Sequence, residues 1–222
     1  MSKIKNMLTL QQELNDNTNG LGWEDGLTKQ GKKINWKRCI FLESAELIDS
    51  YPWKHWKNID AKVDRENIKI ELVDIWHFVM SEALRVAKKE GKPIEQLANS
   101  IEPKVANIKA SSFKDYYEEI EAIESFIQEL FCSFELEKFI TSFLELSFTL
   151  GLDLDELYKL YLGKNILNKF RQEHGYKDGS YIKIWNGKED NVVMQEILEA
   201  NPDILANELY KKLEEVYKGL KA

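Results

Sequence analysis

Apolar residues recur at intervals of three and four along most of the chain, the spacing that places them on one face of an α-helix. Four prolines and eleven glycines in 222 residues leave long segments without a break. The pattern predicts helices over 8–14, 36–50, 66–90, 94–110, two within 115–150, one over 153–173, and two more before the C-terminus. It therefore predicts an all-α helical bundle.

The expected ends of these helices carry recognisable residues. Asp153 is expected to cap a helix, with Glu156 three positions later completing a capping box. The segments 19–31 and 175–191 interrupt the periodicity and are expected to be loops, the second with a hairpin at Asn186-Gly187. Pro103 is expected to interrupt the helix over 94–110, and the last helix is expected to begin at Asn201 and Pro202.

Length and composition indicate one domain over residues 1–222, because 43% hydrophobic residues suffice for a core without disulfides. The segment 91–135 carries no chemical motif and is interpreted as a variable helical insertion. No signal peptide and no apolar run of about 18 residues are recognisable. We therefore expect a cytoplasmic protein that does not enter a membrane. The net charge of −7 argues against a nucleic-acid polymer as partner.

Two pairs of acidic residues have the same spacing on two predicted helices. Glu43 and Glu46 form one pair, and Glu71 and Asp74 form the other. A spacing of three places both carboxylates of a pair on one helical face, and apolar residues surround both pairs. Burying such carboxylates without partners is costly, so we expect the two helices to face each other across a divalent cation. Ligands that are all oxygen favour Mg²⁺, with Mn²⁺ as a substitute.

These acids have two other interpretations. They could be solvated charges on amphipathic helices, and one isolated pair usually is. A di-iron bundle would need Glu-x-x-His motifs. His77 follows Asp74 by three residues, but neither His55 nor His174 supplies a matching motif. The repetition of the pair in two apolar contexts favours the magnesium site.

A basic stripe follows on the helix opened by Asp153. Lys164, Asn168 and Arg171 share one face, and the next loop adds basic and aromatic residues. Residues 164–188 hold six basic and two acidic side chains, in a chain that is acidic as a whole. This composition fits phosphate binding, although a solvated helix face with a surface loop is the ordinary alternative. The loop 175–191 is expected to be a mobile flap that closes over the phosphates.

Two further groups of residues are candidates for substrate binding. Gln11 and Asn15 lie one turn apart on the first helix, and their carboxamides offer the donor and acceptor that a pyrimidine edge requires. The aromatic segment 53–57, with His55 and Lys57, follows the first acidic helix and could reach the same cleft. Its tryptophans could equally belong to the core or to a dimer interface, and both interpretations stay open.

The paired acids resemble the signature of the all-α nucleoside triphosphate pyrophosphatases. Three further segments are similar to the dimeric dUTPases: LQQELND at 10–16, GKNILNKFRQEHGYKDGSY at 163–181 and WNGKEDN at 185–191. The resemblance implies a magnesium-dependent homodimer that hydrolyses dUTP, and also dUDP, to dUMP. It implies metal binding by the four acids and uracil or sugar contacts from Gln11, Asn15 and Asn168. It assigns the phosphates to Lys164, Arg171, Tyr176, Lys177 and Lys183.

The expected reaction is attack of water on a phosphoanhydride. Glu43 is the expected base that accepts the proton of this water, with Glu46 as the alternative. The other enzyme that fits the same residues is a related all-α pyrophosphatase with another nucleotide preference, such as dCTP or a housecleaning substrate. A helical interaction module with acidic surface residues is the non-catalytic alternative.

Overall fold

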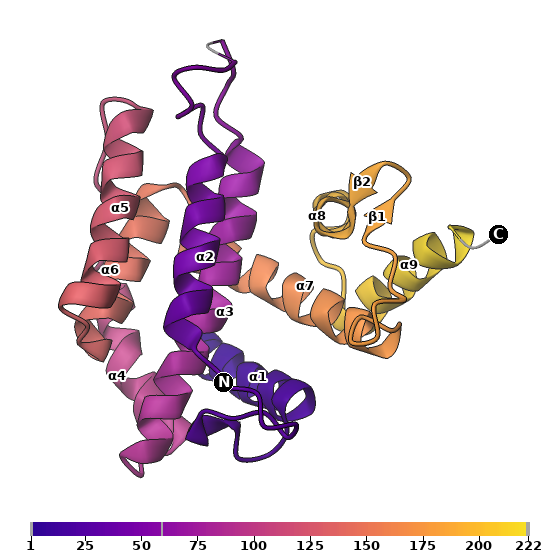
Figure 1. Cartoon of the computed structure of the whole chain (residues 1–222), viewed down its shortest axis with the longest axis horizontal. Helices are drawn as coiled ribbons and strands as arrows, with labels where there is room; N and C mark the ends of the chain where they lie inside the picture. Colours follow the sequence, from indigo (N-terminus) through magenta and orange to yellow (C-terminus); the bar gives the residue numbers. More distant parts are fainter. Residues whose placement is uncertain (1, 59, 221–222) are drawn as a thin grey trace. The chain divides into compact units, whose positions relative to one another are not determined.

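The computed structural model describes residues 2–58 and 60–220, and in this part of the chain the all-α prediction is confirmed (Figure 1). Contacts divide the chain into two compact units, one ending at Leu157 and the other beginning at Tyr158, and each is described by itself. The prediction of a single domain with a variable insertion at 91–135 stays a prediction. No helix in the described residues combines the length and apolar character that a membrane crossing requires.

Unit 1 is built around an antiparallel pair of helices, α2 (Trp36–Asp49) and α3 (Arg65–Lys89), which lie side by side (Figure 1). The boundaries agree closely with those predicted from the apolar spacing. Asn35 caps α2 and Asp64 caps α3, each accepting a backbone N–H three residues later. Most of α3 is buried, because other helices of the unit pack around it.

The remaining helices of unit 1 are α1 (Lys3–Asn19), α4 (Ile94–Asn107), α5 (Tyr116–Cys132) and α6 (Leu136–Thr149). Helix α1 is longer than predicted, because Ser2 caps it and its polar second half is held against α3 by hydrogen bonds rather than by apolar contacts. The expectation that Pro103 interrupts α4 was wrong. The helix continues past it, with Leu97, Ala98 and Ile101 buried.

Helix α7 (Leu154–Glu173) begins in unit 1 and continues into unit 2. Asp153 caps it as predicted, since its Oδ1 accepts the N–H groups of Asp155 and Glu156, both at 2.9 Å. The Glu156 carboxylate does not close the expected capping box. It accepts instead from Lys69 Nζ at 2.8 Å, because a cation of α3 lies within reach.

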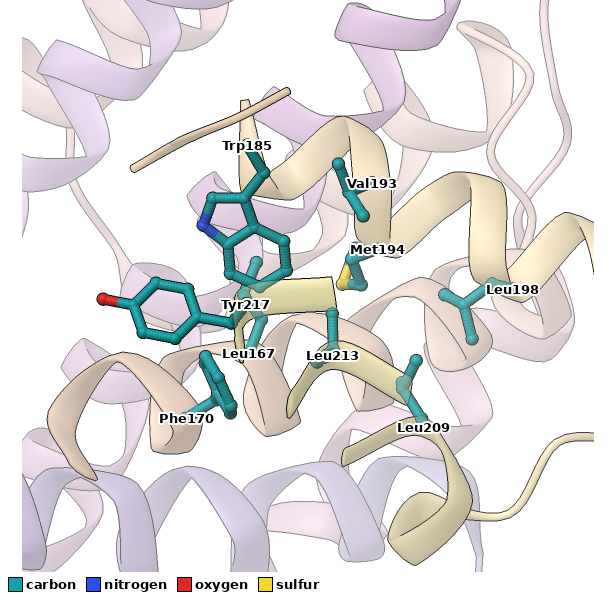
Figure 2. Close-up of a cluster of buried hydrophobic side chains, with 9 residues drawn as sticks. All are labelled: Leu167, Phe170, Trp185, Val193, Met194, Leu198, Leu209, Leu213 and Tyr217. Carbon is teal, nitrogen blue, oxygen red and sulfur yellow. The ribbon is translucent and has the colours of Figure 1, made fainter. Parts of the chain in front are cut away.

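Unit 2 packs the rest of α7 against α8 (Asp190–Ala200) and α9 (Ala206–Gly219) around an apolar cluster (Figure 2). Trp185 and Tyr217 lie within this cluster, above Leu167 and Phe170 of α7. Gly163 allows α7 and α8 to approach, since a Cβ there would lie 2.7 Å from a methyl group of Leu198.

A small hairpin joins α7 to α8, with strands β1 (Ile184–Trp185) and β2 (Lys188–Glu189). Its turn is the predicted Asn186-Gly187, and both residues have positive φ, at 51° and 85°. The predicted start of the last helix was wrong. Asn201 turns back and donates to the carbonyl of Ile197 at 2.8 Å, so it closes α8 and leaves α9 to begin at Ala206.

Candidate active site

Three carboxylates of the two predicted acidic pairs meet between α2 and α3 in unit 1. Glu43, Glu46 and Glu71 each place one oxygen within 4.8 Å of the others. Glu71 is buried, Glu43 is half-buried and Glu46 is exposed, so the group reaches from the helix interface to the solvent. In the described residues this group contains neither histidine nor cysteine. Its donors are therefore all hard oxygen ligands.

The donor set fits a magnesium ion. Mg–O distances of about 2.1 Å place ligands on opposite sides of the ion about 4.2 Å apart. The three oxygens need to move little to reach that spacing. Asp74 is half-buried and lies one turn after Glu71 on α3, but it is not one of the three clustered acids. The paired-acid pattern thus predicted the location of the cluster, and the role of Asp74 stays a prediction.

The negative charge of Glu43 affects a neighbouring thiol. Burial raises the pKa of Cys39, and the carboxylate of Glu43, one turn later on α2, raises it further. The nearby Arg38 only partly offsets both effects. Cys39 therefore stays a neutral thiol beside the acidic cluster.

The two predicted carboxamides lie in a buried hydrogen-bond network between α1 and α3. Gln11 Nε2 donates to Ser81 Oγ at 3.0 Å, and Asn15 Nδ2 donates to the same oxygen at 2.9 Å. Gln11 Oε1 lies 2.7 Å from His77 Nδ1, and Gln11 Nε2 lies 3.3 Å from Asn15 Oδ1. The carboxamides are thus almost completely buried, and His77 is bonded to Gln11 rather than being part of the acidic cluster.

This network shares a face of α3 with the acids. Ser81 follows Asp74 by seven residues, two turns or about 10 Å along the helix. Phe78 lies between them on this face and stacks on Trp36, with ring centroids 5.8 Å apart. Trp23 meets Trp36 edge-on at 5.6 Å. One face of α3 therefore carries, in succession, carboxylates, an aromatic ring and the serine that accepts hydrogen bonds from the buried amides of α1.

In unit 2 the predicted basic stripe is not a solvated surface. Arg171 donates to both carboxylate oxygens of Asp190, at 2.8 and 2.7 Å, and both side chains are buried. Arg171 also donates to Asn168 and Asn191, each at 3.1 Å. Lys164 Nζ donates to Asn191 at 2.8 Å. Lys164 and Arg171 thus converge on Asp190 and Asn191 at the start of α8, and Asn168 joins them through its hydrogen bond with Arg171.

Asp190 is ionised in this network. Burial alone would raise its pKa, but the hydrogen bonds and charge of Arg171 outweigh burial and hold the pKa of this carboxyl below its ordinary value. Tyr181 adds a hydrogen bond to Asp190 at 2.8 Å. Burial and the charge of Asp190 in turn raise the pKa of Tyr181, so this phenol remains protonated. The network is a compact, charge-paired unit.

The loop 175–191, which was expected to be a mobile flap, is anchored to the core at Trp185. Trp185 is fully buried and donates to the carbonyl of Ile182 at 2.7 Å. The backbone N–H of Ile182 donates to the Tyr217 hydroxyl at 3.1 Å. The expectation considered aliphatic residues, whereas aromatic side chains hold this loop to the core. Residues 176–180, which include Tyr176 and Lys177, are exposed, as are 182–184 and 186–189 on either side of Trp185.

The remaining predicted substrate residues lie on the surface. Lys183 pairs with Glu189 at 3.1 Å; partial burial lowers the pKa of this lysine, but the hydrogen bond and charge of Glu189 raise it above its ordinary value. His55 is exposed beside Trp56, with ring centroids 4.8 Å apart, and Lys57 is exposed in the same segment of unit 1. Trp53 and Trp56 are exposed too, so in this chain they are not core residues. Their roles in substrate binding stay predictions.

The sequence of the chain matches a known protein family. A family model described as dUTPase matches residues 3–176, more than three quarters of the chain. The chain belongs to the dUTPase family. Its helical fold is the one expected for the dimeric all-α dUTPases, and membership supports dUTP hydrolysis as its activity. Among curated proteins, none matches this member of the family.

Sequence reasoning missed several polar residues of these networks. Ser81 and His77 hold the carboxamides, and Asp190 and Asn191 hold the cations. Asp190 and Asn191 stand in the quoted segment WNGKEDN, directly after the hairpin turn. Because Asp190 and Asn191 follow the basic stripe closely in the sequence, they could have indicated that its cations are paired within the core.

Proposed function

We propose that this dUTPase-family protein hydrolyses dUTP, and also dUDP, to dUMP in a Mg²⁺-dependent reaction at the Glu43, Glu46 and Glu71 cluster. The convergence of these three carboxylates within 4.8 Å, in a chain of this family, carries the proposal. Asp74 completes the proposed ligand set from the next turn of α3. When bound, Mg²⁺ neutralises phosphate charge and lowers the pKa of a coordinated water.

The carboxylates have different tasks because their environments differ. Glu71 is buried against the helix interface and suits a fixed ligand, whereas Glu43 is half-buried and can meet a water molecule. We assign to Glu43 the acceptance of the proton when water attacks the phosphoanhydride, with Glu46 as the alternative base. The charge that develops on the leaving phosphate requires cations. Lys164 and Arg171, with Lys177, Lys183 and Tyr176, are the proposed phosphate-binding residues.

Base recognition is assigned to the buried amides of α1. Gln11 is held by Ser81 and His77, so its bonding capacity is largely used within the protein. Among the described residues, Asn15 uses one amide hydrogen for Ser81 and one oxygen lone pair for Gln11, which leaves one of each for a ligand. A donor and an acceptor on one amide match the edge of uracil. Along α3, Ser81 lies about 10 Å from Asp74 and about 15 Å from Glu71, a separation comparable to the length of a nucleotide.

A panel of nucleoside triphosphates with pyrophosphate detection, with and without Mg²⁺, tests this function. We expect turnover of dUTP that requires the metal and exceeds that of dCTP by orders of magnitude, because a mismatched base leaves buried amide groups unpaired. Glu46→Gln should reduce turnover by orders of magnitude with an unchanged far-UV CD spectrum. Glu13→Gln, an exposed acid on α1, should behave as the wild type.

The panel also decides between the proposal and its main alternative. Equal kcat/KM for dUTP and dCTP would assign the chain another nucleotide preference within the same chemistry. Full activity of Glu46→Gln would remove the carboxylate cluster from the mechanism.

A further inference from the structure

Asn67 connects the buried acid Glu71 to the end of the neighbouring helix. It lies one turn before Glu71, in the first turn of α3, so both side chains are on one helical face. Its Nδ2 donates to Glu71 Oε1 at 3.2 Å and to Ser50 Oγ at 2.9 Å. Nothing in the sequence pattern of paired acids points to this amide.

The direction of the Asn67 amide is fixed by chemistry. An ionised carboxylate only accepts hydrogen bonds, so the NH₂ group and not the carbonyl must face Glu71. Its second hydrogen goes to Ser50, and a flip of the amide would place the carbonyl oxygen against the Glu71 carboxylate and lose that bond. The amide therefore holds the carboxylate in one direction.

Ser50, the second acceptor of the Asn67 amide, is also held in place. Ser50 is buried at the C-terminal cap of α2, and its carbonyl accepts the N–H of Asp64 at 2.8 Å. The Asp64 side chain accepts the backbone N–H of Asn67 at 3.0 Å. These bonds close a ring through Ser50, Asp64 and Asn67 at the turn between the two acidic helices.

Glu71 needs such support because Glu43 and Glu46 lie within 4.8 Å of it. Like charges at this separation repel, and a carboxylate free to rotate would turn away from them. A hydrogen bond from Asn67 to Glu71 Oε1 opposes that rotation.

We propose that Asn67 is a positioning residue for the metal site, which orients Glu71 toward a divalent cation. The inference rests on the proposed Mg²⁺ dependence. Partners that orient metal ligands in this way typically change metal affinity about 10–100-fold when they are removed. Asn67 itself touches neither the nucleotide nor the reacting atoms in this proposal.

The test is the Mn²⁺ dissociation constant of the full chain, measured by titration calorimetry for the wild type and for Asn67→Ala. We expect binding to weaken about 10-fold or more. Because the amide orients a ligand and takes no part in the chemistry, kcat at saturating Mg²⁺ should stay within about twofold of the wild type while the Mg²⁺ concentration for half-maximal rate rises. Asn207→Ala is a matched control, since Asn207 is an exposed asparagine in the first turn of α9.

Each outcome has a distinct meaning. Unchanged Mn²⁺ affinity in a folded Asn67→Ala variant would overturn the proposal. If that variant showed only a lower melting temperature, the role of Asn67 would be limited to stabilising the start of α3. If Asn67→Ala does not fold, Ser50→Ala removes the anchor and leaves the amide. Weaker Mn²⁺ binding by Ser50→Ala supports the proposal, and wild-type binding overturns it. Absence of Mn²⁺ binding by the wild type would instead refute the proposed metal site.

Discussion

Replacement of Asp190 by asparagine tests how strongly the buried charge network holds unit 2 together. The variant keeps the size of the side chain but removes the negative charge that Arg171 faces at 2.7 and 2.8 Å. Both side chains are less than a tenth exposed, so water cannot replace the lost partner. We expect a loss of about 3–5 kcal/mol, the usual result of leaving one charge of a buried pair without its partner.

The magnitude follows from what remains around Arg171. Asn168 and Asn191 still accept hydrogen bonds from it at 3.1 Å, but neither carries a charge. For a chain of this length a loss of about 3–5 kcal/mol lowers the melting temperature by roughly 6–20 °C. Urea unfolding should be combined with hydrogen exchange in peptides from α8, because the loss should be largest there. Asp203→Asn, at an exposed acid of the same unit, is the control.

The effect of Asp190→Asn should also depend on pH in a defined direction. The folded pKa of Asp190 is below its ordinary value, so the unfolded chain binds this proton more readily. The stability from the ionised carboxylate is therefore complete above the unfolded pKa of about 3.9 and is lost as pH falls through the folded pKa. The gap between wild type and variant should stay constant from pH 7 to about 5 and shrink below about 4. A variant as stable as the wild type, or a gap independent of pH, would refute this reasoning.

Three further outcomes are expected. Glu119→Gln should destabilise unit 1 by about 1–3 kcal/mol in urea unfolding, because Arg65 and Tyr51 lose a charged acceptor, whereas Glu121→Gln on the exposed side of α5 should have little effect. Trp185→Ala should cost about 3–5 kcal/mol by the same measurement, and a loss below about 1 kcal/mol would show that this side chain does not anchor the loop. Trypsin should cleave after Lys177 before Lys183, and a non-hydrolysable dUTP analogue with Mg²⁺ should slow this cleavage. Equal rates with and without the ligand would remove Lys177 from the phosphate site.

The sequence by itself determined the helical class and most helix boundaries. Apolar spacing is a local property, and a cap such as Asp153 acts within three residues, so both can be recognised without a partner segment. The hairpin turn was recognisable for the same reason, since Asn186-Gly187 adopts positive φ at low cost. The paired acids located the carboxylate cluster, because i and i+3 share a face on any helix.

Local patterns failed where distant residues decided the outcome. Asn201 and Pro202 have the composition of a helix start, yet Asn201 bonds to the preceding helix. Glu156 fits a capping box but is taken by Lys69, 87 positions away in the sequence. In both cases the side chain can form hydrogen bonds of similar strength with more than one partner, and the fold determines which partner is within reach.

The chemistry of the polar residues depended most on tertiary structure. The stripe at Lys164 and Arg171 has the spacing of an ordinary solvated helix face, but Asp190 and Asn191 make it a buried hydrogen-bond network. Gln11 likewise looks like a free carboxamide until Ser81 and His77, about 70 positions away, come into contact with it. Spacing along a helix specifies the direction in which a side chain points. What it meets there, and therefore its charge, burial and freedom to bind a ligand, is decided by the packing of segments that are remote in sequence.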